Sequence, residues 1–221
     1  MPPAPFLVLN PRKLPRRQSA RPFRPSHPLP SSVRAFGHLP DVAQLKPGDL
    51  ILVHTLNPGL GSRAIIQVQR NGGHHRNDAK WHHAAVYIGD FQICEAQVSG
   101  GVRLTYFHDY VGTHELRVRR DLALKPADRW KVVVSVLSKL QSSYGRMAAL
   151  RLWWQSTHGF WHPVQSYGDA RAIICSQLYA DAYALVTGRL LMQGRIGLPT
   201  PADLSLTSVL TYVQVDWVRL V

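Results

Sequence analysis

Residues 82–104 read HHAAVYIGDFQICEAQVSGGVRL and are the most informative part of the sequence about the fold. Its apolar residues form two short runs separated by Gly89 and Asp90, a dipeptide typical of tight turns. A second turn, Ser99-Gly100-Gly101, leads into VRLTYF at residues 102–107. Three strands joined by such short turns predict an antiparallel meander.

Further strands are expected on both sides of this meander. LILV at residues 50–53 follows the turn sequence KPGD, and ELRVRR at 115–120 alternates between apolar and polar residues. The last alternating run, TYVQVDWVRL at 211–220, predicts a closing strand. Residues 54–80 are polar and rich in glycine, and they predict a long loop around a short apolar piece at 64–68.

Helical patterns flank the predicted sheet. Pro126 stands where a helix-starting proline is favoured, and apolar residues recur after it at helical spacing: Trp130, Val133, Val134, Leu137 and Leu140. A second helix is predicted from about residue 172 to 186, ended by Gly188, and a third over 147–154. The fold class is therefore α+β, with helices packed against a small antiparallel sheet or half-barrel.

Length and composition bound the class of protein. A chain of 221 residues, 45% of them hydrophobic, is long and apolar enough to bury a core of its own. No apolar run approaches the ~20 residues of a membrane-spanning helix. Near the N-terminus the positive charges follow the apolar piece, the reverse of a secretory signal. The expected location is the cytoplasm, or the periplasm after export by a signal-independent route.

The net charge of +13 is concentrated at the N-terminus. Residues 1–40 contribute +7, contain no acidic residue and hold ten of the sixteen prolines. Such a segment predicts an extended tail that precedes a single domain at 41–221. The tail is either a solvated linker or an arm for anionic surfaces, and no pattern of a specific nucleic-acid binder accompanies it.

The two cysteines differ in their predicted surroundings. Cys175 stands at the start of a predicted helix, where the helix dipole stabilises a thiolate. Cys94 lies in the middle of a strand, and we interpret it as structural. The alternative for Cys175 is the role of a small buried apolar residue, which most free cysteines have. Two cysteines without CxxC spacing form neither a disulfide framework nor a familiar metal site.

A base for the thiol has to come from one of eleven histidines. His83 opens an apolar strand, and Glu95 is the only acidic residue of the strand that follows. A buried carboxylate needs a partner, and an imidazole on the adjacent strand would be oriented by it. An ion pair between Glu95 and an arginine is the alternative, and His82 is a rival base.

Five segments in series resemble the circularly permuted NlpC-type papain-like superfamily, including its YiiX-like members. They are GDLILV (48–53), HHAAVYIGD (82–90), ICEAQVSGGVRL (93–104), ICSQLYADAY (174–183) and TPADL (200–204). The resemblance implies a cysteine peptidase or amidase with a papain-like fold. In it Cys175 would be the nucleophile, His83 the base and Glu95 the residue that orients the base.

The same resemblance implies a substrate pocket, for which Tyr144, Trp81 and His82 are the candidates. Relatives usually carry serine at the position of His82 and an acidic residue at the position of Gln177. The tryptophan-rich stretch at 153–161 is either part of the core or the floor of a substrate groove.

Metal binding is the rival chemistry. The candidate ligands are His74, His75, Asp78, His82 and His83. Adjacent histidines in a strand point to opposite faces, however, and no cysteine completes a familiar zinc site. We therefore expect neither a metal nor another cofactor.

These features predict a cysteine hydrolase that cleaves an amide bond in peptidoglycan peptides, with an anionic polymer as its substrate. Such an enzyme suits a secreted antibacterial effector, with an immunity protein and a secretion machine as partners, or a phage protein. One alternative is an acyltransferase or thioesterase of the lecithin retinol acyltransferase-like type, although ICSQ at 174–177 replaces the Asn-Cys-Glu-His string of that type. The other is a non-catalytic module that binds anionic surfaces.

Overall fold

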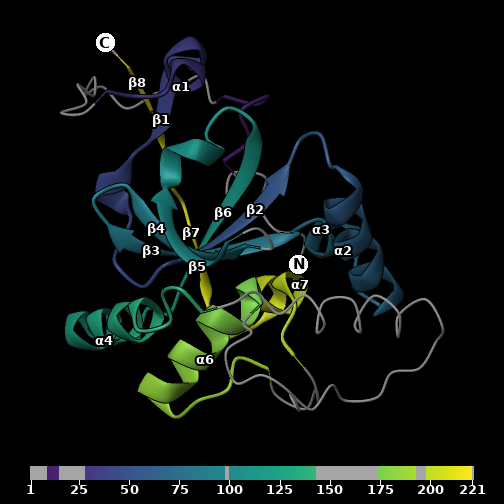
Figure 1. The fold of residues 1–221 in the computed structure, drawn as a ribbon, viewed down its shortest axis with the longest axis vertical. Coiled ribbons are helices and arrows are strands. Elements are labelled where there is room, and N and C mark those ends of the chain that lie inside the picture. Colours follow the sequence, from purple (N-terminus) through teal and green to yellow (C-terminus); the bar gives the residue numbers. More distant parts are fainter. Residues whose placement is uncertain (1–8, 15–27, 98–99, 143–173, 193–197, 221) are drawn as a thin grey trace.

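The computed structural model describes residues 9–14, 28–97, 100–142, 174–192 and 198–220. A six-stranded antiparallel sheet in the order β5-β4-β3-β2-β6-β7 lies at its centre (Figure 1). Its strands are β2 (Leu50–Thr55), β3 (His83–Gly89), β4 (Gln92–Gln97), β5 (Gly101–Tyr106), β6 (His114–Arg120) and β7 (Thr211–Val213). Because helices pack against this sheet, the predicted α+β class is confirmed.

The predicted meander is present as β3, β4 and β5. Asp90 and Phe91 join β3 to β4, and both have positive φ (48° and 59°), as the central residues of a type I′ hairpin turn do. Side chains alternate along β4, so Cys94 packs on the helix side of the sheet and Glu95 points to the opposite side. This alternation decides which groups can meet around the start of β3.

The outer strands differ from a simple meander. β6 lies beside β2 rather than β5, and residues 211–220 form two separate strands instead of one. β7 extends the main sheet, whereas β8 (Trp217–Arg219) pairs with β1 (His38–Pro40) in a two-stranded sheet. Which strands become neighbours depends on contacts between segments that are distant in the sequence. The alternation of apolar and polar residues within one segment does not show which strand that segment pairs with.

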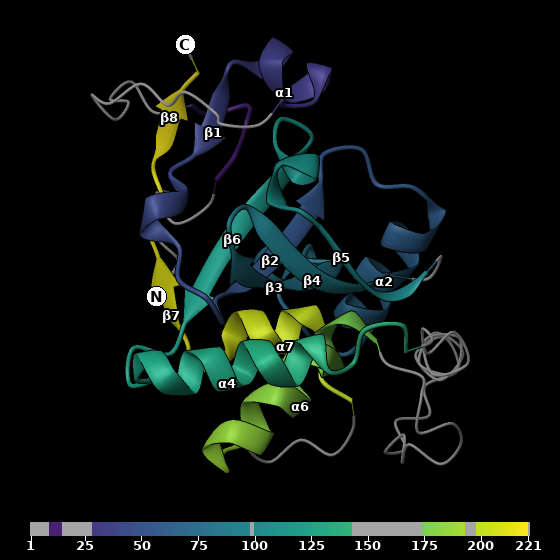
Figure 2. The ribbon, with the colours of Figure 1, turned by 60° about the vertical axis from the view of Figure 1, so that its left-hand side comes forward.

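Three helices cover one side of the sheet in both views: α4 (Pro126–Leu137), α6 (Cys175–Thr187) and α7 (Pro201–Leu206) (Figures 1 and 2). α4 buries Val132, Val133 and Val136. Trp130 and Val134, which the spacing predicted to face the core, are 52% and 62% exposed. The helix turns its narrow valine face inward, which lets it approach α6 closely.

The long loop predicted over residues 54–80 is instead largely helical. It contains α2 (Leu60–Asn71) and α3 (Arg76–Ala79), and Ile66 and Val68 of α2 are buried. The buried Gln69 side chain donates to the backbone oxygens of Ala79 and Trp81 and accepts from the N–H of Ala202, so it ties α2 to α3 and α7. The apolar stripe of α2 is narrow, and the polar and charged residues of its outer face make the segment read as a loop in the sequence.

The N-terminal segment is not an extended tail in the parts that the structure describes. α1 (Ser31–Phe36) and β1 lie within it, and Leu9 bridges to Leu116 of β6. Apolar side chains between the prolines are buried on the sheet face opposite α6: Leu9, Leu29, Val33 and Leu39. In these parts the segment differs from the extended tail expected at 1–40, because its sparse apolar residues pack against the body.

Two of the short segments in the family resemblance have a local structural role. Asp49 of the Gly-Asp pair accepts hydrogen bonds from Lys46 N–H and from Arg120, and it fixes the entry to β2. Thr200 and Asp203 of TPADL form a capping box at the start of α7. In the described ranges, no helix is long and apolar enough to cross a membrane.

Candidate active site

The thiol of Cys175 lies at the first position of α6, directly after the extended residue Ile174. Cys175 is 6% exposed, and its sulfur accepts hydrogen bonds from the backbone N–H groups of Ala84 and Ser176 and from the ring of His83. Burial alone raises the pKa of the thiol. The bond and the charge of His83, with the two N–H groups, outweigh burial and place the pKa below its usual value.

His83 is the first residue of β3, so its ring sits at the end of the strand and reaches groups on both sides of the sheet. Its Nε2 lies 2.7 Å from Oε2 of Glu95, which leaves Nδ1 for the sulfur of Cys175. Burial lowers the pKa of the imidazole, but the bonds to Cys175 and Glu95 and their charges raise it to about 10. The positive charge of the His83 imidazolium and the negative charge of the Cys175 thiolate therefore stabilise each other.

Glu95 is fully buried at the centre of a hydrogen-bond network. Oε2 accepts from His83 and from the Tyr110 hydroxyl at 2.5 Å, and Oε1 accepts from Gln97 at 2.7 Å and from Arg103 at 3.3 Å. Burial raises the pKa of the carboxyl, but the bonds and charges of His83, Tyr110 and Arg103 lower it by more. The net pKa of Glu95 is therefore below its ordinary value. The carboxylate is thus ionised and fixed in place.

The structure brings Cys175, His83 and Glu95 together from α6, β3 and β4. Sequence reasoning did not identify Gln97 and Tyr110 as supporting residues. It gave an ion pair of Glu95 with an arginine as an alternative, and the structure shows that arginine to be Arg103. The period of two along β4 places Gln97 on the face of Glu95, and this signal could have found it. Tyr110 stands in the 3-10 turn η3 (Phe107–Tyr110), where no local pattern points to Glu95.

His82 faces away from this cluster. Its Nε2 accepts the backbone N–H of Thr55 at 2.9 Å, and its ring lies 6.1 Å from that of His54. Burial first, and then the charges of His83 and the neighbouring histidines, lower its pKa to about 3. A neutral imidazole engaged in this way on the opposite side of the strand does not compete with His83 for Cys175.

The other candidate substrate contacts are placed differently. Trp81 is fully buried in the core, with the guanidinium of Arg117 over its ring at 4.6 Å and Lys80 Nζ at 4.8 Å. Its indole therefore lies beneath the surface rather than on it. Tyr144 and the tryptophan-rich stretch at 153–161 lie outside the described residues.

The candidate metal ligands lie apart from one another and contact different partners. His74 Nε2 lies 3.3 Å from Asp203, and Asp78 accepts from Arg117 and Ser205. Across the part of the chain that the structure describes, no group of three histidine, cysteine or acidic side chains is placed to hold an ion. Cys94 is buried in the core, and burial followed by the charge of Glu95 raises its pKa to about 12.

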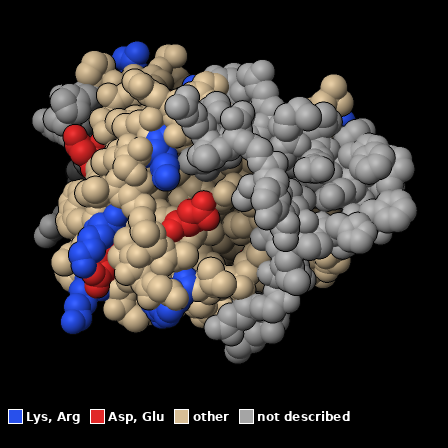
Figure 3. Space-filling view, turned by 60° about the horizontal axis from the view of Figure 1, so that its bottom comes forward, with Lys and Arg blue, Asp and Glu red and all other residues tan. Residues whose placement is uncertain are grey.

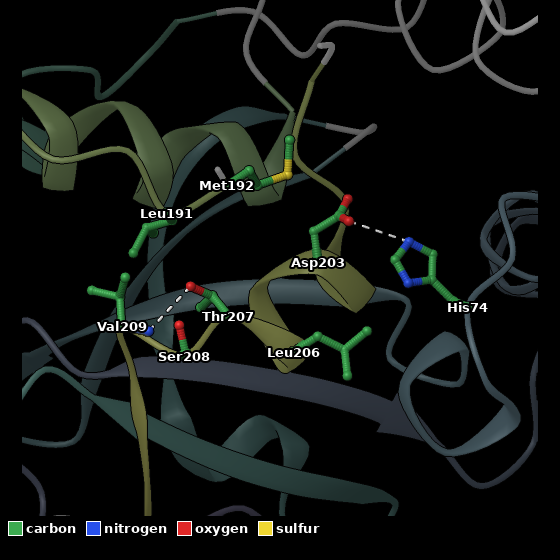
Figure 4. A pocket seen from close by; sticks show the side chains of 8 residues that line it. All are labelled: His74, Leu191, Met192, Asp203, Leu206, Thr207, Ser208 and Val209. Atoms are coloured by element: carbon green, nitrogen blue, oxygen red, sulfur yellow. Dashed lines mark hydrogen bonds and ion pairs between the residues drawn. The ribbon is translucent and has the colours of Figure 1, made fainter. Parts of the chain in front are cut away.

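Pockets lined by described residues also lie outside the Cys175 cluster. A pocket of about 250 Å³ lies beside α7, and Figure 4 shows His74 and Asp203 turned toward one another at its edge. Another pocket, of about 690 Å³, lies between the end of β2, α2 and α3. The residues that line it are His54, Pro58, Arg63, Ile66, Gln67, Arg70, His75, Arg76, Asn77 and Lys80.

Comparison with known proteins supports the fold alone. No family model matches the chain, and no curated protein matches it. Among solved structures, the metalloprotein YiiX from Escherichia coli O157:H7 is similar, with a TM-score of 0.54 and 14% identity over 77% of this chain and 97% of that one. The chain thus has a YiiX-like fold.

Proposed function

We propose that this chain is a cysteine hydrolase that cleaves an amide bond, with peptidoglycan stem or cross-link peptides as its substrate. The observation that carries the proposal is the hydrogen-bonded series Cys175–His83–Glu95, in which the thiol stands at the start of a helix and its pKa is lowered. A fold similar to that of YiiX is compatible with a papain-like hydrolase.

The chemistry uses this chain's own groups. The thiolate of Cys175 attacks the carbonyl carbon, a C–S bond forms, and the oxyanion is stabilised by N–H groups of the first turn of α6, which have no partner within the helix. The Nδ1–H of His83 protonates the leaving nitrogen as the C–N bond breaks. Neutral His83 then takes a proton from water, the resulting hydroxide attacks the thioester, and the acid product leaves Cys175.

The experiment is incubation of the full-length protein with peptidoglycan sacculi, with new amine ends as the readout. We expect release by the natural protein and a loss of several orders of magnitude in Cys175→Ala. Cys94→Ala is the matched control, because it removes the other buried thiol, and it is expected to keep the activity.

Two results would contradict the proposal. Turnover of esters or thioesters without amide cleavage would favour an acyltransferase or thioesterase. An unreactive Cys175 together with binding to sacculi would favour a non-catalytic module.

A further inference from the structure

A pocket with a strong positive charge lies at the end of the sheet that carries His83. It has a volume of about 690 Å³, and its lining includes four cationic side chains: Arg63, Arg70, Arg76 and Lys80. Among the described residues that line it, none is acidic. A pocket of this size holds a segment of a molecule rather than a single small ion.

The positive charge is not neutralised within the described part of the protein. Lys80 pairs with Glu115, and Arg63 donates to the backbone oxygen of Pro58. Arg70 and Arg76 form no ion pair with any residue that the structure describes, and both are exposed. Like charges held around one pocket repel, and a bound anion would relieve that repulsion.

The face that carries α4 and α6 differs in charge from the pocket. Figure 3 looks onto the side of the molecule that carries α4 and α6, and most of the described surface there is uncharged. The charged side chains visible on it include both signs, in places side by side. The described surface of this face thus carries both signs, whereas the described lining of the pocket carries positive charge only.

The pocket lies next to the Cys175 cluster. Val53 of β2 pairs with His83 of β3, and His54, the next residue of β2, lines the pocket. The rings of His54 and His82 are 6.1 Å apart, and His82 adjoins His83 in the chain. α2 and α3 leave the sheet at this same end (Figure 1). The Cys175 cluster and the pocket therefore lie at the same end of the sheet.

We propose that this pocket binds a carboxylate-bearing part of the peptide whose amide bond is presented to Cys175. The inference rests on the proposed function and names the feature of the substrate that is recognised. Arginine presents paired N–H donors that match a carboxylate. Gln67 and Asn77 supply neutral amide groups for the peptide backbone, and burial, followed by the charge of Lys80, lowers the pKa of His54 and keeps its ring neutral.

The test measures binding without turnover. Full-length Cys175→Ala protein is titrated by calorimetry with a synthetic peptidoglycan stem tetrapeptide with free carboxylates, and with the same peptide fully amidated. We expect the free acid to bind at least about tenfold more tightly, with an advantage that falls as salt rises. The double variant Arg70→Glu/Arg76→Glu should lose at least about tenfold in affinity for the free acid.

The matched control is Arg34→Glu/Arg219→Glu. It makes the same change of net charge at two exposed arginines on α1 and β8, away from the pocket, and it should bind the acid as the parent does. Circular dichroism checks that both double variants are folded.

The pocket assignment is overturned if the amidated peptide binds equally well, or if the Arg70/Arg76 variant keeps its affinity. It is also overturned if inorganic pyrophosphate binds more tightly than the peptide, since the site would then be one for phosphate. Selective binding with no hydrolysis of sacculi by the natural protein would overturn the proposed reaction alone. Hydrolysis that is insensitive to the Arg70/Arg76 change would overturn the pocket alone.

Discussion

The two buried cysteines belong to the same core beneath the sheet but have opposite surroundings. Cys94 lies in the middle of β4, where burial, followed by the charge of the Glu95 carboxylate, raises its pKa to about 12. Cys175, at the start of α6, has two N–H donors and the imidazolium of His83, and its pKa is lowered. Burial disfavours the thiolate at both sites, so the difference arises from the partners.

The largest effect that this comparison predicts is in alkylation. At pH 7, iodoacetamide should modify Cys175 at least about 1,000-fold faster than Cys94, because the reactive species is the thiolate. Mass spectrometry of peptides after timed quenching measures the two rates. In denaturant the rates should converge, and equal rates in the folded protein would refute the assignment.

A smaller effect on alkylation is expected when the imidazolium of His83 is removed. In His83→Gln the pKa of Cys175 should return toward that of an ordinary thiol, and its alkylation rate at pH 7 should fall about 100-fold. His82→Gln is the matched control, since glutamine can still accept the Thr55 N–H, and the rate should stay within about twofold. A large loss in the His82 variant alone would move the base to that residue.

The hairpin and the residues on it could be predicted from the sequence because their determinants are local. Gly89 and Asp90 mark the turn, alternation sets the faces of β3 and β4, and a carboxylate in an apolar strand demands a partner. The structure brings His83 and Glu95 together as this reasoning expects. The link to Cys175 rested on the family resemblance, because more than 90 residues separate it from His83.

What could not be predicted depends on contacts between distant segments. The place of β6 beside β2 and the split of the last strand follow from packing, not from alternation. The N-terminal segment has the composition of a solvated arm, yet Val33 and Leu39 are buried on the body. Tyr110 donates its hydrogen bond to Glu95 from a short turn after β5, and no spacing in the sequence predicts this contact.

A moderate effect is expected from neutralising the residue that orients His83. Glu95→Gln keeps an oxygen that can accept the Nε2–H of His83, but it no longer stabilises the imidazolium. Amide cleavage should fall about tenfold to 100-fold, less than in His83→Gln. Parallel assays of the two variants on sacculi give the ranking, and a greater loss in the Glu95 variant would contradict the assigned roles.

The smallest effect should come from Tyr110→Phe, which removes one hydrogen bond to Glu95 and leaves the ring in place. We expect amide cleavage at neutral pH to fall only about threefold, near the lower end of what one hydrogen bond typically contributes, because the other bonds to the carboxylate remain. Tyr106→Phe, at an exposed ring of β5, is the matched control and should have no effect.

The pH profile separates a positioning role of Tyr110 from a merely structural one. The Tyr110 bond helps to lower the pKa of Glu95, so the carboxylate stays ionised in mildly acidic solution. A carboxyl whose pKa is lowered by folding contributes stability at pH values above its ordinary pKa. That stability is lost as the pH falls through the pKa of the folded state. Without the hydroxyl the folded pKa of Glu95 rises, and the acid limb of the rate profile should move to higher pH. A uniform loss at every pH would mean that Tyr110 only supports the fold.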